Sequence, residues 1–322
     1  MTDLPASVEL TLADADRLWN HVADLNARRS SEPHQAEQQV RIAAMAVAAL
    51  PPHVIAAVHD FRNYGNQHDV LRVRRALPDA ASVGPTPNRS PGAPESDERE
   101  IAAIGLLAIS LLLGEPFTFA DLHQGRLVQN VLPLPGQEDT QTSGGSRTFL
   151  DWHVEDAFSA DRCDYFALLC LRGHPAAQTL TTSVRQLGLA QSTEAVLRER
   201  RFAVSPDVAH QSDGHPAVPT AVILGRKDDP EICYDSVYMH PTNPGDTAAR
   251  AALDDVAAAV QNRALSLVLE PGDLLLVDNR RVVHGRTPFP AAYDGKDRWL
   301  LRAMTCSSLC RHRARGACRA IA

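Results

Sequence analysis

A series of short apolar segments follows Phe117, and this pattern constrains the fold more than any other feature of the 322-residue chain. The segments are rich in Val, Leu and aromatic residues, and Gly, Pro or Asp clusters separate them, which is typical of short strands joined by turns. Many short strands at irregular spacing favour a sandwich or jelly roll over a sheet that alternates with helices. We expect strands at residues 127–134, 149–153, 165–171, 221–225, 231–238, 266–269 and 274–278.

Helices are expected mainly before that series. Thr11 and Asp14 form a capping-box pattern ahead of apolar residues at helical spacing. A short strand should then occupy residues 70–77. The expected helices cover residues 12–25, 34–50, 53–61, 97–113, 184–199 and 246–264; the second stops at two consecutive prolines, and the fourth is apolar enough to be largely buried.

The chain is expected to form a single domain over residues 1–322, with a helical region at 1–116 and a jelly-roll core with a basic C-terminal segment at 117–322. Residues 78–94 are rich in Pro, Ser, Gly and Ala, which indicates a loop. This loop could drape over the mouth of a site, but a surface connection is the simpler interpretation.

Composition excludes several classes of protein. A 44% hydrophobic content argues against disorder, no apolar run reaches a membrane span of about 18 residues, and the N-terminus lacks a signal-peptide pattern. We therefore expect a cytoplasmic globular protein without a membrane partner. The net charge of −7 and scattered basic residues argue against nucleic acid, although the arginines of residues 311–319 leave a small basic patch as an alternative. Six cysteines without a C-x-x-C pair are expected to be reduced thiols.

Three residues suggest a metal site. His153 and Glu155 are two apart at the end of an expected strand, so their side chains should point to the same face. His284 follows a strand-turn-strand signal and would supply a third ligand. Two imidazoles and one carboxylate leave other metal positions open, as in non-haem Fe(II) oxygenases. A lone His-x-Glu pair is weak evidence, because 13 histidines and 39 acidic residues produce such pairs by chance.

Arg298 follows His284 by fourteen residues. An arginine on the next strand could form a two-pronged contact with the distal carboxylate of a keto-acid co-substrate. The alternative for this residue is a salt bridge with Asp294 or Asp297.

Taken together, these motifs resemble the clavaminate synthase-like branch of the Fe(II)/2-oxoglutarate-dependent oxygenases, particularly its arginine, asparagine and lysine hydroxylases. The resemblance covers residues 124–315 well and the helical part loosely, through Pro85-Thr86-Pro87. The segments that carry it are residues 152–158 (WHVEDAF), 168–172 (LLCLR), 271–274 (PGDL), 278–286 (DNRRVVHGR) and 294–299 (DGKDRW).

The resemblance implies a distorted double-stranded β-helix, or jelly roll, with a mostly helical N-terminal region packed against it. It also implies that His153, Glu155 and His284 bind Fe(II), that Arg298 anchors 2-oxoglutarate, and that O2 is the second co-substrate. Thr179 matches a threonine that contacts 2-oxoglutarate, with Thr181 as the alternative. The retained carboxylate favours hydroxylation, because halogenating relatives have a small residue in that position.

For the substrate, the resemblance implies that Gln129 and Glu155 hold the α-amino group and that Ser143 and Arg302 make further polar contacts, Arg302 with the α-carboxylate. Alternatively, Gln129 and Ser143 are surface or turn residues, and Arg302 only supports Arg298. Arginine-specific relatives carry two acidic residues, two apart, that hold the guanidinium. Here Asp235 is present but no second Asp follows at that spacing, which leaves arginine open.

Residues 207–219, which include His210, Asp213 and His215, match the family's lid. The implied function is hydroxylation of a free L-amino acid, at the β carbon of arginine or an arginine-like basic amino acid, in specialised metabolism such as antibiotic biosynthesis. Asparagine, lysine or a carrier-bound amino acid are alternatives for the substrate. A zinc hydrolase with the same three ligands and a non-enzymatic jelly-roll binding protein are alternatives of another class.

Overall fold

Two β-sheets form the centre of the molecule. The computed structural model describes residues 5–28, 35–78, 82–89, 96–206, 218–313 and 319–321. The large sheet has the order β1-β2-β13-β6-β15-β3-β16, with β4 also paired to β15, and the small sheet has the order β12-β7-β14-β5. The large sheet consists of β1 (Ala6–Glu9), β2 (Val70–Arg74), β3 (Glu115–Phe119), β4 (Val128–Val131), β6 (Tyr165–Arg172), β13 (Leu274–Asp278), β15 (Trp299–Cys306) and β16 (Ala320–Ile321). The small sheet consists of β5 (Leu150–His153), β7 (Thr179–Ser183), β12 (Leu265–Leu267) and β14 (Val282–Arg286).

The two sheets face each other across a shared apolar core. Phe166 and Leu168 of β6 lie in one hydrophobic cluster with Leu267 of β12 and Val282 of β14. The alternate residues of β6, such as Leu169, belong to a second cluster with the N-terminal helices. The large sheet is therefore buried on both faces, as alternation along a strand requires. These paired sheets confirm the expected jelly roll.

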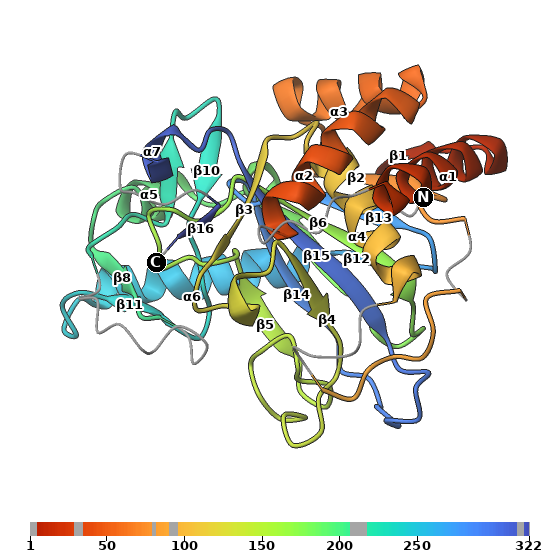
Figure 1. Cartoon of the computed structure of the whole chain (residues 1–322). Helices are drawn as coiled ribbons and strands as arrows, with labels where there is room; N and C mark the ends of the chain where they lie inside the picture. The colour runs from red at the N-terminus through yellow and green to blue at the C-terminus, as the bar shows by residue number, and fades with distance from the viewer. Residues whose placement is uncertain are drawn as a thin grey trace.

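Helices cover the outer faces of both sheets (Figure 1). The N-terminal group packs against the large sheet and comprises α1 (Leu12–Ala27), α2 (Gln35–Ala46), α3 (Pro52–Tyr64) and α4 (Asp97–Ser110). The outer face of the small sheet, including Trp152 and Val283, packs against α6 (Thr247–Asn262) beside α5 (Gln191–Leu197). The remaining elements are α7 (Cys310–Arg313) and two hairpins, β8 (Phe202–Val204) with β11 (Met239–Pro241) and β9 (Ile223–Gly225) with β10 (Pro230–Ile232).

The N-terminal helices form for the reasons that the sequence predicts. Thr11 caps α1, its hydroxyl accepts a hydrogen bond from the Asp14 amide, and the Asp14 carboxylate accepts one in return from the Thr11 amide. Trp19 of α1 packs on α4 at Gly105, where an added Cβ would lie 2.8 Å from the indole ring. The expected burial of α4 is also confirmed.

Two of the expected elements are wrong. The strand predicted at 231–238 ends at Ile232, because residues 233–238 turn and β11 starts only at Met239. The helix predicted at 184–199 is a short 3-10 turn, Val184–Gln186, followed by α5; Gly188, with φ 61°, separates the two. Strands β1, β3, β7 and β8 were not predicted, since each is too short for a clear alternating pattern.

The described part of the Pro-rich loop is bound to the core rather than lying free on the surface. Thr86 is buried, and its hydroxyl donates to the carbonyl of Asp297 at 2.6 Å. The Thr86 amide donates to the carbonyl of Gly295, and Arg172 donates to the Thr86 hydroxyl. The loop therefore fixes the segment that leads into β15.

Four cysteines, Cys163, Cys170, Cys233 and Cys306, are buried and belong to no disulfide. The sequence placed Cys306 in the basic tail, whereas it is the last residue of β15. In the described ranges no single helix has the length and apolarity for a membrane span, and one pair, Ala36–Ala49 with Pro52–Tyr64, meets the criteria only jointly and is bent by 116°.

Candidate active site

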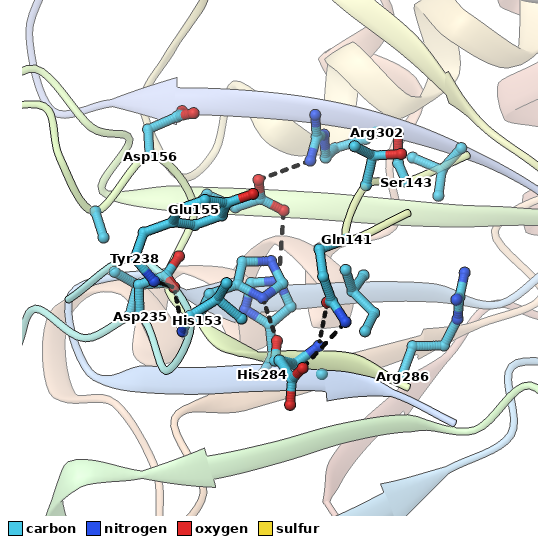
Figure 2. Close-up of a pocket in the computed structure, with 18 of the residues that line it drawn as sticks. Gln141, Ser143, His153, Glu155, Asp156, Asp235, Tyr238, His284, Arg286 and Arg302 are labelled. Carbon is cyan, nitrogen blue, oxygen red and sulfur yellow. Dashed lines mark hydrogen bonds and ion pairs between the residues drawn. The ribbon is translucent and has the colours of Figure 1, made fainter. Parts of the chain in front are cut away.

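His153, Glu155 and His284 converge inside the jelly roll (Figure 2). His153 ends β5 and pairs across the small sheet with His284 of β14. Glu155 lies just beyond the end of β5, and its Oε1 is 3.4 Å from Nε2 of His284. Potential ligand atoms of the three residues all lie within 4.8 Å of one another, which is suitable for one metal ion. Two imidazoles and a carboxylate fit Fe(II) and leave coordination positions open.

Neighbouring groups orient these side chains. Nδ1 of His153 donates to the carbonyl of Asp151 at 2.7 Å, which leaves Nε2 available as a metal ligand. Asn279 binds the backbone of Glu155 twice, because its Oδ1 accepts from the Glu155 amide at 2.8 Å and its Nδ2 donates to the Glu155 carbonyl at 3.1 Å. Asn279 also donates to the carbonyl of Cys163. Asn279 lies in the DNRRVVHGR segment, but its residue type alone does not indicate this role.

The charge states of the cluster suit metal binding. Burial alone would raise the pKa of the Glu155 carboxyl, but the charge of Arg302 and a hydrogen bond from His284 hold that pKa well below its ordinary value. Burial and the neighbouring His153 lower the pKa of His284 to about 4. A carboxylate and a neutral imidazole are the forms that bind a metal ion.

Arg298 lies at the wall of the same cavity, immediately before β15, and only 5% of it is exposed. The alternative salt bridge is not formed, since the Asp297 carboxylate accepts hydrogen bonds from the amides of Ala292 and Tyr293 instead. Within the described part of the chain no carboxylate forms an ion pair with Arg298. Burial lowers its pKa to about 10, so the guanidinium is still a cation at neutral pH.

A second arginine, Arg286 of β14, lines the cavity beside Arg298. It points to the same face as His284, two residues earlier, and its guanidinium donates to the carbonyls of Gly145 and Thr148. Burial, with a smaller effect of Arg298, lowers its pKa to about 9. Arg286 was not predicted as a site residue, although its position two residues after His284 on a strand indicates the same face.

The two candidate threonines lie on β7. Thr179 is opposite Arg286 and lines the cavity. Thr181 is opposite His284, is buried, and is not among the lining residues. The arrangement therefore favours Thr179 over Thr181 for contact with a molecule in the cavity.

Arg302 joins Glu155 to Gln129. Its Nη1 is 2.7 Å from Oε2 of Glu155, and its Nε and Nη2 donate to Oε1 of Gln129 at 3.0 and 2.6 Å. Gln129 is 1% exposed, lies outside the cavity lining, and donates through Nε2 to the hydroxyl of Thr118. Gln129 thus lies behind Arg302 and supports it. Arg302 itself supports Glu155 rather than Arg298.

The other expected substrate contacts, Ser143 and Asp235, both line the cavity (Figure 2). Oδ1 of Asp235 accepts hydrogen bonds from the amides of Val237 and Tyr238, at 2.8 and 2.7 Å. The proposed lid residues His210, Asp213 and His215 lie outside the described residues.

Two further cavity residues, His123 and Asp156, have left-handed backbone conformations, with φ values of 46° and 53°. Burial, together with the charge of Arg302, lowers the pKa of His123 to about 4, so its ring is neutral. His and Asp adopt this region more often than most residues, but the sequence does not show which of them do so, because the conformation is fixed by the folded context.

Comparisons with known proteins agree with this geometry. The family described as taurine catabolism dioxygenase TauD, TfdA family, matches residues 176–304. The enduracididine beta-hydroxylase of Streptomyces hygroscopicus is 33% identical, over 87% of this chain and 89% of that protein. The L-asparagine oxygenase of Streptomyces coelicolor is 35% identical, over 96% and 93% of the two chains.

Solved structures of the non-heme iron oxygenase OrfP give the same result. The complex of OrfP with Fe and alpha-ketoglutaric acid has a TM-score of 0.87 and 32% identity, and covers 98% of this chain and 100% of OrfP. The complex with Fe, succinate and (3S)-hydroxy-L-Arg has a TM-score of 0.87 and 30% identity. The jelly roll, the His-Glu-His cluster and these relatives together show the family. The chain belongs to the clavaminate synthase-like Fe(II)/2-oxoglutarate-dependent oxygenases, in the branch that contains the amino-acid hydroxylases.

Proposed function

We propose that this oxygenase hydroxylates a free L-amino acid with a basic side chain, arginine or an arginine-like residue, at the β carbon. The assignment of the co-substrate depends mainly on Arg298. This residue is a buried cation without a carboxylate partner in the described chain, and it lines the cavity that holds the His-Glu-His cluster. A buried unpaired charge is costly, so its retention beside this cluster favours an anionic ligand such as 2-oxoglutarate. A zinc hydrolase would have no need for such a group.

In this proposal His153, Glu155 and His284 hold Fe(II), and Arg298 and Thr179 bind the distal carboxylate of 2-oxoglutarate. When bound, iron with 2-oxoglutarate and O2 supplies the oxidising power that replaces a C–H hydrogen by a hydroxyl group, with release of succinate and CO2. The protein orients the reactants and excludes water. No general base is required for cleavage of the C–H bond.

The Arg302–Glu155 pair gives a physical route for binding an amino-acid zwitterion. The α-carboxylate of the substrate would bind Arg302 and Ser143, and its α-ammonium would approach Oε2 of Glu155. Each charge of the existing pair then finds an opposite charge on the substrate, so neither is left buried and unpaired. Gln129 stays behind Arg302, where its side-chain oxygen accepts hydrogen bonds from the guanidinium.

We further propose that the chain acts in the cytoplasm, as one oxygenase domain over residues 1–322, without a nucleic-acid or membrane partner. The names of two relatives, enduracididine beta-hydroxylase and clavaminate synthase 2, support a role in specialised metabolism, such as antibiotic biosynthesis. Asparagine is the second candidate substrate, because the asparagine oxygenase aligns over 96% of the chain.

Anaerobic reconstitution with Fe(II) and 2-oxoglutarate tests the assignment. We expect a weak metal-to-ligand charge-transfer band in the visible, and a burst of succinate when O2 is admitted with the correct amino acid. Each of the twenty amino acids is then added in turn, and the product is analysed for a β-hydroxyl group. A band without any burst would contradict arginine, asparagine and the other standard amino acids as the substrate, and the absence of a band would contradict the iron and 2-oxoglutarate site.

A further inference from the structure

Two buried arginines of the cavity wall pack against one aromatic ring, that of Phe289. The guanidinium carbon of Arg286 lies 4.9 Å from the centroid of this ring, and that of Arg298 lies 6.0 Å from it. Both distances are within the range of a cation–π interaction. Phe289 is only 3% exposed and is not among the residues that line the cavity, so its ring contacts the two arginines from behind the wall.

The chain around Phe289 holds its ring in one place. Phe289 lies between Pro288 and Pro290, and the backbone of a residue before proline is restricted. Its amide donates to the carbonyl of Ser146 at 2.8 Å. The ring of His174 packs against the phenyl ring, with 5.4 Å between the two centroids. Phe289 therefore offers a fixed surface to the two guanidinium groups.

The two arginines differ in what else holds them. Arg286 donates to the carbonyls of Gly145 and Thr148, so hydrogen bonds fix its guanidinium. The guanidinium of Arg298 makes no hydrogen bond and no ion pair with the described chain, so all of its donors are left to a ligand. Its contact with Phe289 is then the interaction that orients it. Arg286 restricts it further, because like charges repel and Arg286 is fixed.

We propose that Phe289 is a positioning residue for the keto-acid co-substrate, whose ring fixes the direction of the Arg298 guanidinium and thereby the length of keto diacid that the site accepts. This inference rests on the proposed function, in which Arg298 binds the distal carboxylate of 2-oxoglutarate. A fixed anchor sets one distance from the His-Glu-His cluster, so a keto diacid with an additional methylene should fit poorly.

Preorganisation gives the physical reason for an effect on affinity. The contact between Phe289 and Arg298 is present with and without a ligand, so its own energy largely cancels in the binding equilibrium. Without the ring, the guanidinium is free to turn and must be ordered when the carboxylate binds, which lowers affinity. The same freedom lets the guanidinium adjust to a longer ligand.

Phe289→Leu tests the inference, because leucine keeps an apolar side chain and lacks the ring. The dissociation constant of 2-oxoglutarate, from anaerobic titration of the charge-transfer band, should rise by about 3- to 10-fold, as for one side chain that must be ordered on binding. The wild-type protein should bind 2-oxoglutarate at least about 10-fold more tightly than 2-oxoadipate, and the variant should lose at least about threefold of this preference. With the amino acid that gives a succinate burst, kcat at saturating 2-oxoglutarate should change by less than about twofold.

The matched control is Phe61→Leu. Phe61 lies in α3, is 4% exposed, and contacts the ring of Tyr165 rather than a cation. This variant should lose thermal stability and leave both dissociation constants unchanged. If Phe289→Leu fails to fold, Phe289→Met provides the same test, because the flexible methionine side chain fills irregular gaps.

The outcomes separate this inference from the proposed function. Unchanged 2-oxoglutarate binding in the folded Phe289 variant, an unchanged preference over 2-oxoadipate, or a loss confined to kcat would overturn the role of Phe289 while the oxygenase stands. Equal affinity of the wild-type protein for the two keto acids would overturn the selection by length. Absence of the charge-transfer band in the wild-type protein would instead overturn the proposed function.

Discussion

Arg302 and Glu155 form a buried ion pair, with Nη1 of the arginine 2.7 Å from Oε2 of the carboxylate. The other oxygen of Glu155 is 3.4 Å from Nε2 of His284. One carboxylate therefore contacts both the metal cluster and Arg302, the residue that we propose binds the substrate carboxylate. Changes at Arg302 and at Arg298 should separate these two sites experimentally.

Arg302→Lys should weaken amino-acid binding and spare 2-oxoglutarate. Lysine keeps the positive charge but cannot contact Glu155, Gln129 and a substrate carboxylate at once, because it lacks the planar fork. We expect kcat/KM for the amino acid to fall by about 100-fold, and the 2-oxoglutarate concentration for half-maximal charge-transfer absorbance to change by less than about threefold. Arg226→Lys, at an exposed pair with Asp228, is the control. The opposite pattern, with 2-oxoglutarate affected and the amino acid spared, would contradict the assignment of Arg302.

Arg298→Met should stabilise the protein without ligands and remove its response to 2-oxoglutarate. The wild-type guanidinium is buried and has no ion-pair partner among the described residues, so an apolar side chain of similar length should raise the free energy of unfolding by about 1–3 kcal/mol. Ligand binding then no longer raises the melting temperature. Thermal unfolding with and without 2-oxoglutarate, for both proteins, measures the two effects. Equal stabilisation of both proteins by 2-oxoglutarate would show that Arg298 is not its anchor.

Much of this site could be predicted from the sequence because its ligands fall in short local patterns. His153 and Glu155 are two residues apart, and His284 and Arg298 have a fixed spacing on consecutive strands. Asp151 could not be identified in this way, since nothing in its local sequence distinguishes it and its place in the cavity wall follows from the fold. The left-handed conformation of His123 likewise could not be predicted, because histidine only weakly favours it and the fold decides where it occurs.

The difference between local patterns and the folded context also explains which helices and strands were predicted wrongly. The long helix α6 has strong periodicity, the strands β6 and β13 are nearly continuous apolar runs, and the sequence predicted all three. Residues 233–238 have an apolar composition typical of a strand, but Asp235 accepts two backbone hydrogen bonds there and forms a turn. A local side-chain contact therefore outweighs the strand preference of its neighbours.

Asn279→Ala should reduce metal affinity although Asn279 is not a ligand. Its amide group holds the backbone of Glu155 by two hydrogen bonds, so its loss lets the carboxylate move relative to the histidines. We expect the Fe(II) dissociation constant to rise by about 10- to 100-fold, as for other groups that orient metal ligands. Titration of the apoprotein with Fe(II) in the presence of 2-oxoglutarate measures this. The variant should recover full band intensity at saturating iron, and failure to do so would indicate a general loss of folding instead.

Asp278→Asn should change how stability depends on pH. Burial, opposed mainly by Arg281, raises the pKa of the Asp278 carboxyl to about 6, and the nearby Asp69 also raises it. The folded state therefore keeps a proton that the unfolded chain releases near its ordinary pKa of 3.8, so this contribution to stability is complete below about pH 4 and is lost as the pH rises through 6. The difference of about two pKa units corresponds to about 3 kcal/mol.

Asn cannot ionise, so the variant does not lose stability as the pH rises through 6. Relative to that of the wild-type protein, its free energy of unfolding should increase between pH 4 and pH 7 by up to about 3 kcal/mol. The contact between Asp278 and Arg281, at 2.8 Å, is already contained in the pKa of about 6, so its removal shifts the stability of the variant by a constant amount and does not alter this gain. Urea unfolding of both proteins at half-unit pH intervals measures the difference. A difference that stays constant with pH would mean that Asp278 is ionised in the folded protein throughout, and that Arg281 outweighs burial.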